Sequence, residues 1–351
     1  MTIDDDIGEA ASVVAERAWP GLYPWQAAAA DAMVADRARW PHALLVTGAR
    51  GIGKRTLALE FARALLCETP RATGHACGVC ASCRYVSAGQ HPDLRVVEPI
   101  EHDDDGTPKP VEWIAVERIR GLIEWAQLTS HRRIAKVAVI VPADRMNIAA
   151  ANALLKTLEE PPPSTYLILV SAAPGRIPAT LRSRCACLVA PRPDATAAGA
   201  WLAAHGAAAP DTLLAQAAGA PLAALALADP AYQAERAVWL KALAAPAALV
   251  PAELAARIDA APREERRERL GMVVEWLLGW CGDLALAQAG VVPRRNGDHA
   301  ATISRLAAAV APVPLFRYYR ALLRQRGLIA HPLQPRLLVE ALLTDYRSLF
   351  R

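Results

Sequence analysis

The stretch Ala43-Leu-Leu-Val-Thr-Gly-Ala-Arg-Gly-Ile-Gly-Lys54 decides the fold, because it joins an apolar run to a glycine loop. The run before Gly48 is short and apolar, which predicts a buried strand. From Thr56 to Leu66, apolar side chains recur at helical spacing. A glycine loop between a strand and a helix can cradle phosphate oxygens with its backbone N–H groups. The candidate nucleotide-binding residues are therefore Gly48, Gly51, Gly53, Lys54 and Thr56.

Two features that normally hold Mg²⁺ are missing around this loop. Arg55 stands where a Ser or Thr would bind the cation, and the next hydroxyl comes one position late, about 100° round the helix. The second apolar run, Lys136–Val141, ends in Pro142 instead of the carboxylate that such ATPases need. Asp144 lies beyond that proline, where we expect a turn or helix-cap residue. We therefore expect a catalytically inactive loop that does not bind ATP productively; an active ATPase is the alternative.

Further segments continue the alternation of strand and helix. Helical patterns cover Ile114 to Ser130 and Asn147 to Glu160, and a third apolar run covers Tyr166 to Ser171. This order predicts an α/β fold with a parallel sheet flanked by helices. A helix-like segment, Trp25 to Trp40, precedes the first strand. The acidic, proline-rich residues 98–112 predict a solvated loop.

The chain is too long for one ordinary core, so we expect several domains. After Pro191 alanine dominates, and the pattern is helical to the end. We expect an α/β domain over 1–192, a small helical domain over 193–230 and an all-helical domain over 231–351. The second boundary rests only on Asp229-Pro230.

Composition excludes several classes of protein. Of the 351 residues, 54% are hydrophobic and 21% are charged, which excludes a largely disordered chain. The formal net charge of +4 is far from the balance of a dedicated nucleic-acid binder. The first residues are acidic where a secretory signal would be basic. The longest uncharged stretch, Thr212 to Ala228, is shorter than the roughly 20 apolar residues of a membrane span. We expect a soluble, cytoplasmic protein.

Four of the seven cysteines lie close together in the sequence, in the pattern Cys67-x9-Cys77-x2-Cys80-x2-Cys83. Two-residue spacings let neighbouring sulfurs converge on one ion, and four thiolates suit tetrahedral Zn²⁺. Gly74 and Gly78 allow the turns that such a knuckle needs. An iron–sulfur cluster and free thiols are the alternatives, but structural zinc is favoured. The other three cysteines are expected as small buried residues: Cys185, Cys187 and Cys281.

Several blocks together resemble the bacterial clamp-loader AAA+ subunits. After the cysteine knuckle comes Gln90-His-Pro-Asp93, followed by Ala151-Asn-Ala-Leu-Leu-Lys-Thr-Leu-Glu-Glu-Pro-Pro162 and by Ala179-Thr-Leu-Arg-Ser-Arg-Cys185. Their order and spacing are similar to those of the family. The resemblance covers residues 20–230 well and the helical last third in outline.

The resemblance implies an AAA+ P-loop domain with an inserted zinc knuckle, a helical lid over 193–230 and a collar over 231–351. The family's sensor arginine falls on Gly219-Ala-Pro-Leu222 and is lost. The glycine loop and the end of the second strand are altered as well. In lacking all three features, the chain resembles a non-hydrolysing member of the family. Such a subunit has no ATPase activity of its own but belongs to the DNA polymerase III holoenzyme and serves DNA replication.

The resemblance also implies a role for the motif Ser183-Arg184-Cys185. In the family this arginine reaches a neighbouring subunit's ATP site as an arginine finger, so Arg184, beside Ser183, would be catalytic in trans. The residues alone favour a solvent-facing Arg184 on a short helix. The implied partners are the gamma/tau and delta subunits, the sliding clamp and primer–template DNA. A zinc-containing nucleic-acid adaptor of another class is a further alternative.

Other polar residues are weaker candidates for contact with a neighbour or with DNA. Asn152, Lys156 and Glu159 lie on the helix before the prolines, where a solvated helix face is an equal alternative. Contacts to the DNA backbone need only Lys, Arg and helix N-termini. The basic residues that could supply them are Arg118, Arg120, Arg132, Arg133 and Lys136.

Overall fold

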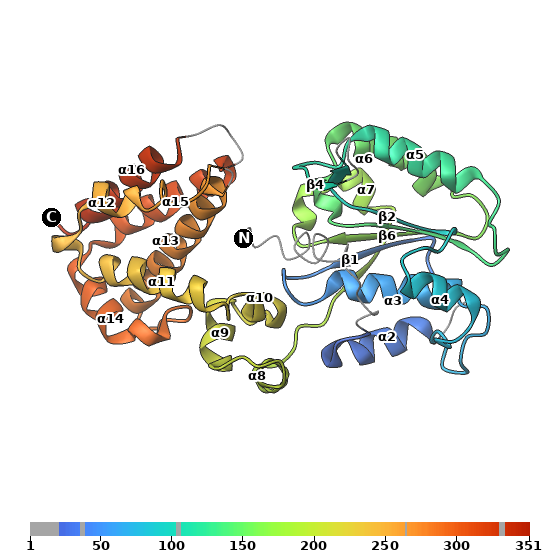
Figure 1. Ribbon diagram of the computed structural model, residues 1–351, viewed down its shortest axis with the longest axis horizontal. Coiled ribbons are helices and arrows are strands. Elements are labelled where there is room, and N and C mark those ends of the chain that lie inside the picture. The colour runs from blue at the N-terminus through green and yellow to red at the C-terminus, as the bar shows by residue number, and fades with distance from the viewer. Residues whose placement is uncertain (1–20, 36–38, 103–106, 264, 330–333) are drawn as a thin grey trace. The chain divides into compact units, whose positions relative to one another are not determined.

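The chain divides into two compact units, and the division falls between Pro193 and Asp194. Figure 1 shows the computed structural model, which describes residues 21–35, 39–102, 107–263, 265–329 and 334–351. Residues 1–20 of the predicted first domain therefore lie outside the described residues. The predicted boundary near residue 230 stays a prediction.

The first unit is built on a five-stranded parallel sheet with the strand order β2-β5-β6-β1-β7. The predicted α/β architecture is confirmed. Strand β1 pairs with β6 on one side and with β7 on the other. The strands in chain order are β1 (Ala43–Thr47), β2 (Leu94–Val97), β5 (Lys136–Ile140), β6 (Thr165–Ser171) and β7 (Ala186–Val189).

Helices cover both faces of this sheet, as Figure 1 shows. Helix α3 (Lys54–Leu66) lies against one face, with α2 (Ala27–Val34) and α4 (Ala81–Ser87) packed on it. On the other face, α5 (Val116–Gln127), α6 (Ile148–Glu159) and α7 (Ala179–Arg182) share one apolar core with the strands. Because successive strand side chains point to opposite faces, a strand buried on both sides is apolar throughout. The uninterrupted apolar run of β1 meets this requirement.

Two strands of the sheet were not predicted. Both strands have only four residues, and Arg95 interrupts the apolar run of β2. Strand β7 is apolar but mostly exposed, because it lies at the edge of the sheet. Their place in the sheet comes from pairing with β5 and β1, which are far away in the sequence.

Two other local predictions were wrong. The expected loop 98–112 contains a two-stranded antiparallel sheet of β3 (Ile100–His102) and β4 (Pro108–Pro110), while residues 103–106 lie outside the described ones. Prolines lack a backbone N–H and are tolerated in such edge strands. The expected helix from Trp25 to Trp40 is a 3-10 turn, η1 (Pro24–Gln26), followed by α2, and Trp40 is buried outside any helix. Residues 36–38 lie outside the described residues.

The second unit is helical, as the sequence predicts. It contains two apolar clusters, one within 198–228 and a larger one within 239–346. Most of its helices begin with proline, whose fixed φ suits the first helical position. The helices are α8 (Ala195–Ala204), α9 (Pro210–Gln216), α10 (Pro221–Ala226), α11 (Pro230–Leu243), α12 (Pro251–Ala256), α13 (Arg266–Gln288), α14 (Ala300–Ala309), α15 (Pro312–Leu328) and α16 (Pro335–Ser348), with 3-10 turns η5 (Pro246–Ala248) and η6 (Gly297–His299).

Helix α13 is long and apolar enough to cross a membrane by length and composition alone. However, 61% of its most apolar window is buried inside the protein, and the helix packs against α14, α15 and α16. Residues 297–309 and 312–328 pass the same test only if they are joined as one span, and they are bent by 117°. A helix in a protein core passes this test, so α13 is weak evidence for a membrane.

Candidate functional site: metal centre, glycine loop and surface arginine

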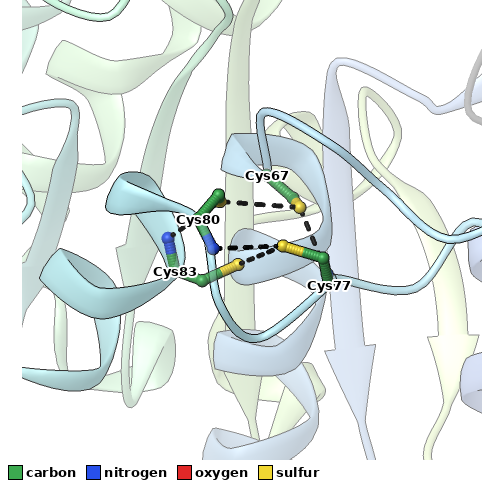
Figure 2. Close-up of side chains that lie close together, drawn as sticks. All are labelled: Cys67, Cys77, Cys80 and Cys83. Carbon is green, nitrogen blue, oxygen red and sulfur yellow. Dashed lines mark hydrogen bonds between the residues drawn. The ribbon is translucent and has the colours of Figure 1, made fainter.

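The four clustered cysteines converge at the end of α3, where Figure 2 shows their sulfurs pointing toward one another. Cys67 directly follows the helix, Cys77 lies in the next loop, Cys80 caps α4 and Cys83 lies within α4. The Sγ atoms of Cys67 and Cys80 are 3.9 Å apart, as are those of Cys77 and Cys83. All four sulfurs lie within 4.8 Å of one another. Zn–S bonds near 2.3 Å place tetrahedral sulfurs about 3.8 Å apart, so the geometry fits Zn²⁺.

Backbone and hydroxyl donors surround the sulfurs in the way that metal-bound thiolates require. The Sγ of Cys77 accepts hydrogen bonds from the Thr69 hydroxyl and from the N–H groups of Val79 and Cys80. These donors, Thr69 first, lower the pKa of Cys77 to about 5. Burial instead raises the pKa of Cys83 to about 12. Because a buried thiol resists ionisation, a cation is needed to hold all four as thiolates in one place.

The knuckle is fastened to the rest of the first unit on two sides. Gly74 has φ +86°, and a Cβ there would lie 1.9 Å from the carbonyl oxygen of Val34 at the end of α2, so only glycine fits. His75 contacts Asp31 of the same helix at 2.7 Å. The carboxylate of Glu68, next to Cys67, accepts hydrogen bonds from Ser82 and Arg132. A metal bound here would therefore stabilise the packing of α2, α3 and α4.

The remaining cysteines only partly match the expectation of small buried residues. Cys281 is fully buried in α13. Cys185 is half-buried, and burial raises its pKa to about 11. Cys187 is exposed, which corrects the prediction. It lies on the edge strand β7, most of whose residues are exposed.

The glycine loop joins β1 to α3 as predicted, with Gly48, Gly51 and Gly53 all at positive φ. Lys54 opens α3 but is 1% exposed, and its Nζ donates a hydrogen bond of 2.8 Å to the carbonyl of Ala49. The ammonium thus contacts the loop itself. Thr56 is buried within α3, so its hydroxyl is not presented to a cation beside the loop. The structure brings the five predicted residues together between β1 and α3, with the Lys54 ammonium on the Ala49 carbonyl.

The segment before α2 packs directly on this loop. Trp25 Nε1 donates to the carbonyl of Ile52 at 3.0 Å, and the buried Gln26 amide donates to Ile52 and Gly53 at 3.1 and 2.7 Å. A Cβ on Gly53 would lie 2.4 Å from the ring of Tyr23. Tyr23 and Trp25 stack with ring centroids 5.0 Å apart. The chain itself therefore covers the Ile52–Gly53 side of the loop.

The position that would hold Mg²⁺ carries a fixed positive charge. Arg55 Nε donates to Glu98 Oε1 at 2.8 Å, and both side chains are largely buried. A guanidinium has no acceptor atom, so it cannot bind a cation. Asp144, expected in a turn or cap, lies in the 3-10 turn η3 (Ala143–Arg145), where its carboxylate accepts a hydrogen bond from Ser171 at 2.5 Å. At the predicted sensor position, Gly219–Leu222 forms the turn into α10 and supplies no guanidinium.

The Ser183-Arg184-Cys185 turn connects α7 to β7 and presents one arginine to solvent. The Cys185 thiol donates to the carbonyl of Leu181 at 3.4 Å and packs against the core shared by α5, α6 and α7. Ser183 Oγ donates to the carbonyl of Thr180 at 3.1 Å. Arg184 points outward, where its guanidinium contacts Glu159 at the end of α6. Anchoring by Cys185 and Ser183 explains how a short turn can hold Arg184 in place.

Arg184 and the glycine loop lie at opposite ends of two neighbouring parallel strands, β7 and β1. Strand β7 runs parallel to β1, with Leu44 beside Ala186 and Thr47 beside Val189. The glycine loop follows the carboxyl end of β1, whereas Arg184 precedes the amino end of β7. Three residue steps, from Leu44 beside Ala186 to Thr47, at about 3.3 Å each separate these ends by about 10 Å. Arg184 is therefore not part of the chain's own phosphate loop.

The predicted basic residues differ in how accessible they are. Lys136 is only 3% exposed, lies 4.5 Å from the Trp125 ring centroid and donates to the Trp125 carbonyl, so it cannot contact DNA. Strand β5, which begins at Lys136, is buried throughout, which the sequence did not indicate for a lysine. Arg132 is paired with Glu68, and Arg118 donates to the carbonyl of Ile100. The exposed members of the set are Arg120 and Arg133, and Asn152 and Lys156 are exposed on α6.

Comparison with known proteins places these features in one family. The family model described as DNA polymerase III, delta subunit, matches residues 30–193. DNA polymerase III subunit delta' of Pseudomonas aeruginosa is 38% identical over 265 residues, which cover 74% of this chain and 76% of that protein. The chain belongs to the family of DNA polymerase III delta' subunits. The Escherichia coli delta' subunit is 39% identical over 214 residues, covering 58% of this chain and 60% of that protein.

The chain also matches a second kind of DNA polymerase III subunit over a shorter stretch. The Escherichia coli DNA polymerase III subunit tau is 38% identical over 144 residues, which cover 41% of this chain and 20% of that protein. Membership in the delta' family confirms the resemblance drawn from the cysteine knuckle and the Leu-Glu-Glu-Pro-Pro and Ser-Arg-Cys blocks. Sequence reasoning missed Glu98, Gln26 and Thr69, because nothing local links them to Arg55, Gly53 and Cys77.

Proposed function

We propose that this member of the delta' family is the non-hydrolysing subunit of a cytoplasmic clamp loader that serves DNA replication. In this role it assembles with gamma/tau and delta subunits and helps to load the sliding clamp on primer–template DNA. It donates Arg184 to the ATP site of a neighbouring motor subunit. A guanidinium near the γ-phosphate stabilises charge that develops in the transition state.

The observation that carries this proposal is the separation of Arg184 from the chain's own glycine loop. The arginine lies at the amino ends of the parallel strands, and the loop lies at their carboxyl ends. An exposed arginine held on a braced turn at that end is suited to a phosphate on another subunit. Ser183 serves Arg184 by contacting it and the Thr180 carbonyl, rather than by reacting.

The absence of hydrolysis is supported by three separate features of the loop. Lys54 is committed to Ala49, Arg55 is paired with Glu98, and the second strand continues into Val141-Pro142 without a carboxylate. Tight binding and hydrolysis of Mg-ATP by the isolated chain would instead favour the active-ATPase alternative.

Zinc has a structural role in this proposal. When bound, Zn²⁺ would be held by Cys67, Cys77, Cys80 and Cys83, and four protein thiolates leave no open position for substrate. The ion supplies cross-linking and charge compensation, while the chemistry of the complex takes place elsewhere. The exposed Arg120 and Arg133 are proposed contacts to the DNA backbone.

The helical second unit offers a surface for a partner subunit along α15. Its outer face combines exposed apolar side chains, with Phe316 54% and Val313 60% exposed, and arginines at helical spacing. No ion pair is found within the described residues for these arginines, which are Arg317, Arg320 and Arg324. Aromatic and arginine side chains are enriched in interface hot spots. We propose that this face binds an acidic, partly apolar helical surface of a clamp-loader partner.

The arginine finger is tested in a complex reconstituted with gamma/tau and delta subunits. We expect Arg184→Ala to lower ATP hydrolysis at the neighbouring site by about 10³-fold or more, while the complex still assembles. Arg182→Ala, which removes an exposed arginine at the end of α7 just before the turn, is the matched control and should leave hydrolysis unchanged. Unchanged DNA-stimulated hydrolysis in the assembled Arg184→Ala complex would overturn the assignment.

The partner surface is tested by reversing its charge. We expect the triple change R317E/R320E/R324E to weaken assembly with the partner subunits by about tenfold or more, because like charges then face each other. Arg305→Glu on α14, exposed in the same unit, is the control for a general charge effect. Gel filtration of the mixed subunits measures assembly, and equal assembly of both variants would contradict the proposed face.

A further inference from the structure

We propose that Glu159 is a positioning residue: its ion pair with Arg184 holds the guanidinium within the chain until a phosphate competes for it. The inference rests on the proposed role of Arg184 as an arginine finger. It adds a stowed state, in which Arg184 is paired with Glu159 of its own chain. The strength of this pair then determines how easily Arg184 is released to bind a phosphate.

Most of the N–H donors of Arg184 are already used by acceptors of its own chain. A guanidinium has five N–H donors. Arg184 Nε donates to Glu159 Oε1 at 2.8 Å, and Arg184 Nη2 also contacts that oxygen. Arg184 Nη1 donates to the Thr180 carbonyl at 2.7 Å and to Ser183 Oγ at 3.4 Å. Four donors are thus used within the chain, which leaves too few for the paired bonds by which arginine binds phosphate.

The position of each acceptor shows which contact must be exchanged. Ser183 belongs to the same turn as Arg184, and Thr180 lies in α7 directly before that turn, so both brace the position of Arg184 from the same continuous segment. Glu159 comes from the end of α6, a separate element, and is the acidic group in the set. The Glu159 contact is therefore the one that a competing anion replaces.

Exposure makes this exchange accessible. The side chains of Arg184 and Glu159 are 36% and 50% exposed. An ion pair between exposed side chains contributes little to stability, so a phosphate of higher charge can displace the carboxylate. The same carboxylate would also repel a phosphate that approaches Arg184. Both effects predict that Glu159 lowers the occupancy of the engaged finger.

The chain offers a matched control one residue further along. Glu160 is an exposed carboxylate directly after Glu159, and no contact between it and Arg184 is found in the described part of the chain. Glu159→Gln and Glu160→Gln remove the same charge from neighbouring positions. A difference between them therefore reports the contact with Arg184 and not the overall charge of this end of the sheet.

The experiment uses the reconstituted complex with gamma/tau and delta subunits, in the absence of DNA. We expect Glu159→Gln to raise kcat/KM for ATP by about two- to fivefold at low salt, with a smaller rise at high salt, and Glu160→Gln to change neither. In an Arg184→Ala background, Glu159→Gln should have no effect. A merely structural role of Glu159 would not produce this dependence on Arg184.

The outcomes separate the two proposals. If Arg184→Ala lowers hydrolysis but Glu159→Gln behaves like Glu160→Gln, the stowed state is overturned and the arginine finger stands. An effect of Glu159→Gln that persists in the Arg184→Ala background also overturns the inference. If Arg184→Ala itself leaves hydrolysis unchanged, the proposed function fails, and the inference fails with it.

Discussion

The two ends of α3 carry two predicted sites, a glycine loop at its start and a cluster of four cysteines just past its end. At its start, the glycine loop keeps its backbone shape, but Lys54 and Arg55 contact protein groups. Just past its end, Cys67 joins three other cysteines whose sulfurs are spaced for a tetrahedral metal. A phosphate loop can lose its chemistry one side chain at a time and still fold, because its shape depends on the backbone. A structural zinc site is closed by four protein ligands, so the loss of one cysteine opens the coordination shell of the ion.

The difference also shows what each end does for the fold. The glycine loop packs against Tyr23 and Gln26, so it serves the packing of the first unit without a ligand. In the knuckle, burial raises the pKa of Cys83, so we expect a bound cation to stabilise the thiolates there. The comparison can be tested by damaging each end in turn.

The largest expected effect follows from damaging the metal end. Cys83→Ser should abolish the binding of about one zinc ion per chain and lower the free energy of unfolding by more than about 4 kcal/mol. Metal analysis of the purified chain and chemical denaturation measure the two effects. Cys187→Ser, at an exposed cysteine, is the control and should change neither. Full zinc occupancy in Cys83→Ser would remove the basis for the comparison.

A smaller effect is expected from the ion pair beside the glycine loop. Glu98→Gln leaves the largely buried Arg55 guanidinium without its carboxylate and should cost about 2 kcal/mol of unfolding free energy. Chemical denaturation measures this change, while zinc content should stay constant. Glu101→Gln, at an exposed position on β3, is the matched control. If the two variants unfold alike, Arg55 does not stabilise this end of α3.

The smallest effect is expected at Lys54. Lys54→Met keeps most of the side-chain volume but removes the hydrogen bond to Ala49, which should cost about 1 kcal/mol. Since we propose that this loop does not bind ATP productively, ATP hydrolysis by the assembled complex should be unchanged. Isothermal titration of the unmodified chain with Mg-ATP provides the sharper test. Tight binding that Lys54→Met abolishes would show that both ends of α3 are complete sites.

Local sequence was a good guide where a residue's role depends on its neighbours in the chain. The central strands, the glycine loop, the helical second unit and the spacing of the four cysteines were all read from short windows. It was a poor guide where the partner is distant. Lys136 looked like a surface cation but begins a buried strand against Trp125. Strand β7 became recognisable only through its pairing with β1.

By itself, the sequence determined the family, the cluster of four cysteines and the replacement of the residues expected to hold Mg²⁺, because these depend on residue types at fixed spacing. Only the tertiary structure decided that Arg184 and the glycine loop lie at opposite ends of neighbouring strands, and that Arg184 contacts Glu159. It also decided that Arg55 is paired with Glu98 and that Gln26 covers Gly53. Such contacts join segments far apart in the chain, and they form only when the sheet brings its strands into register.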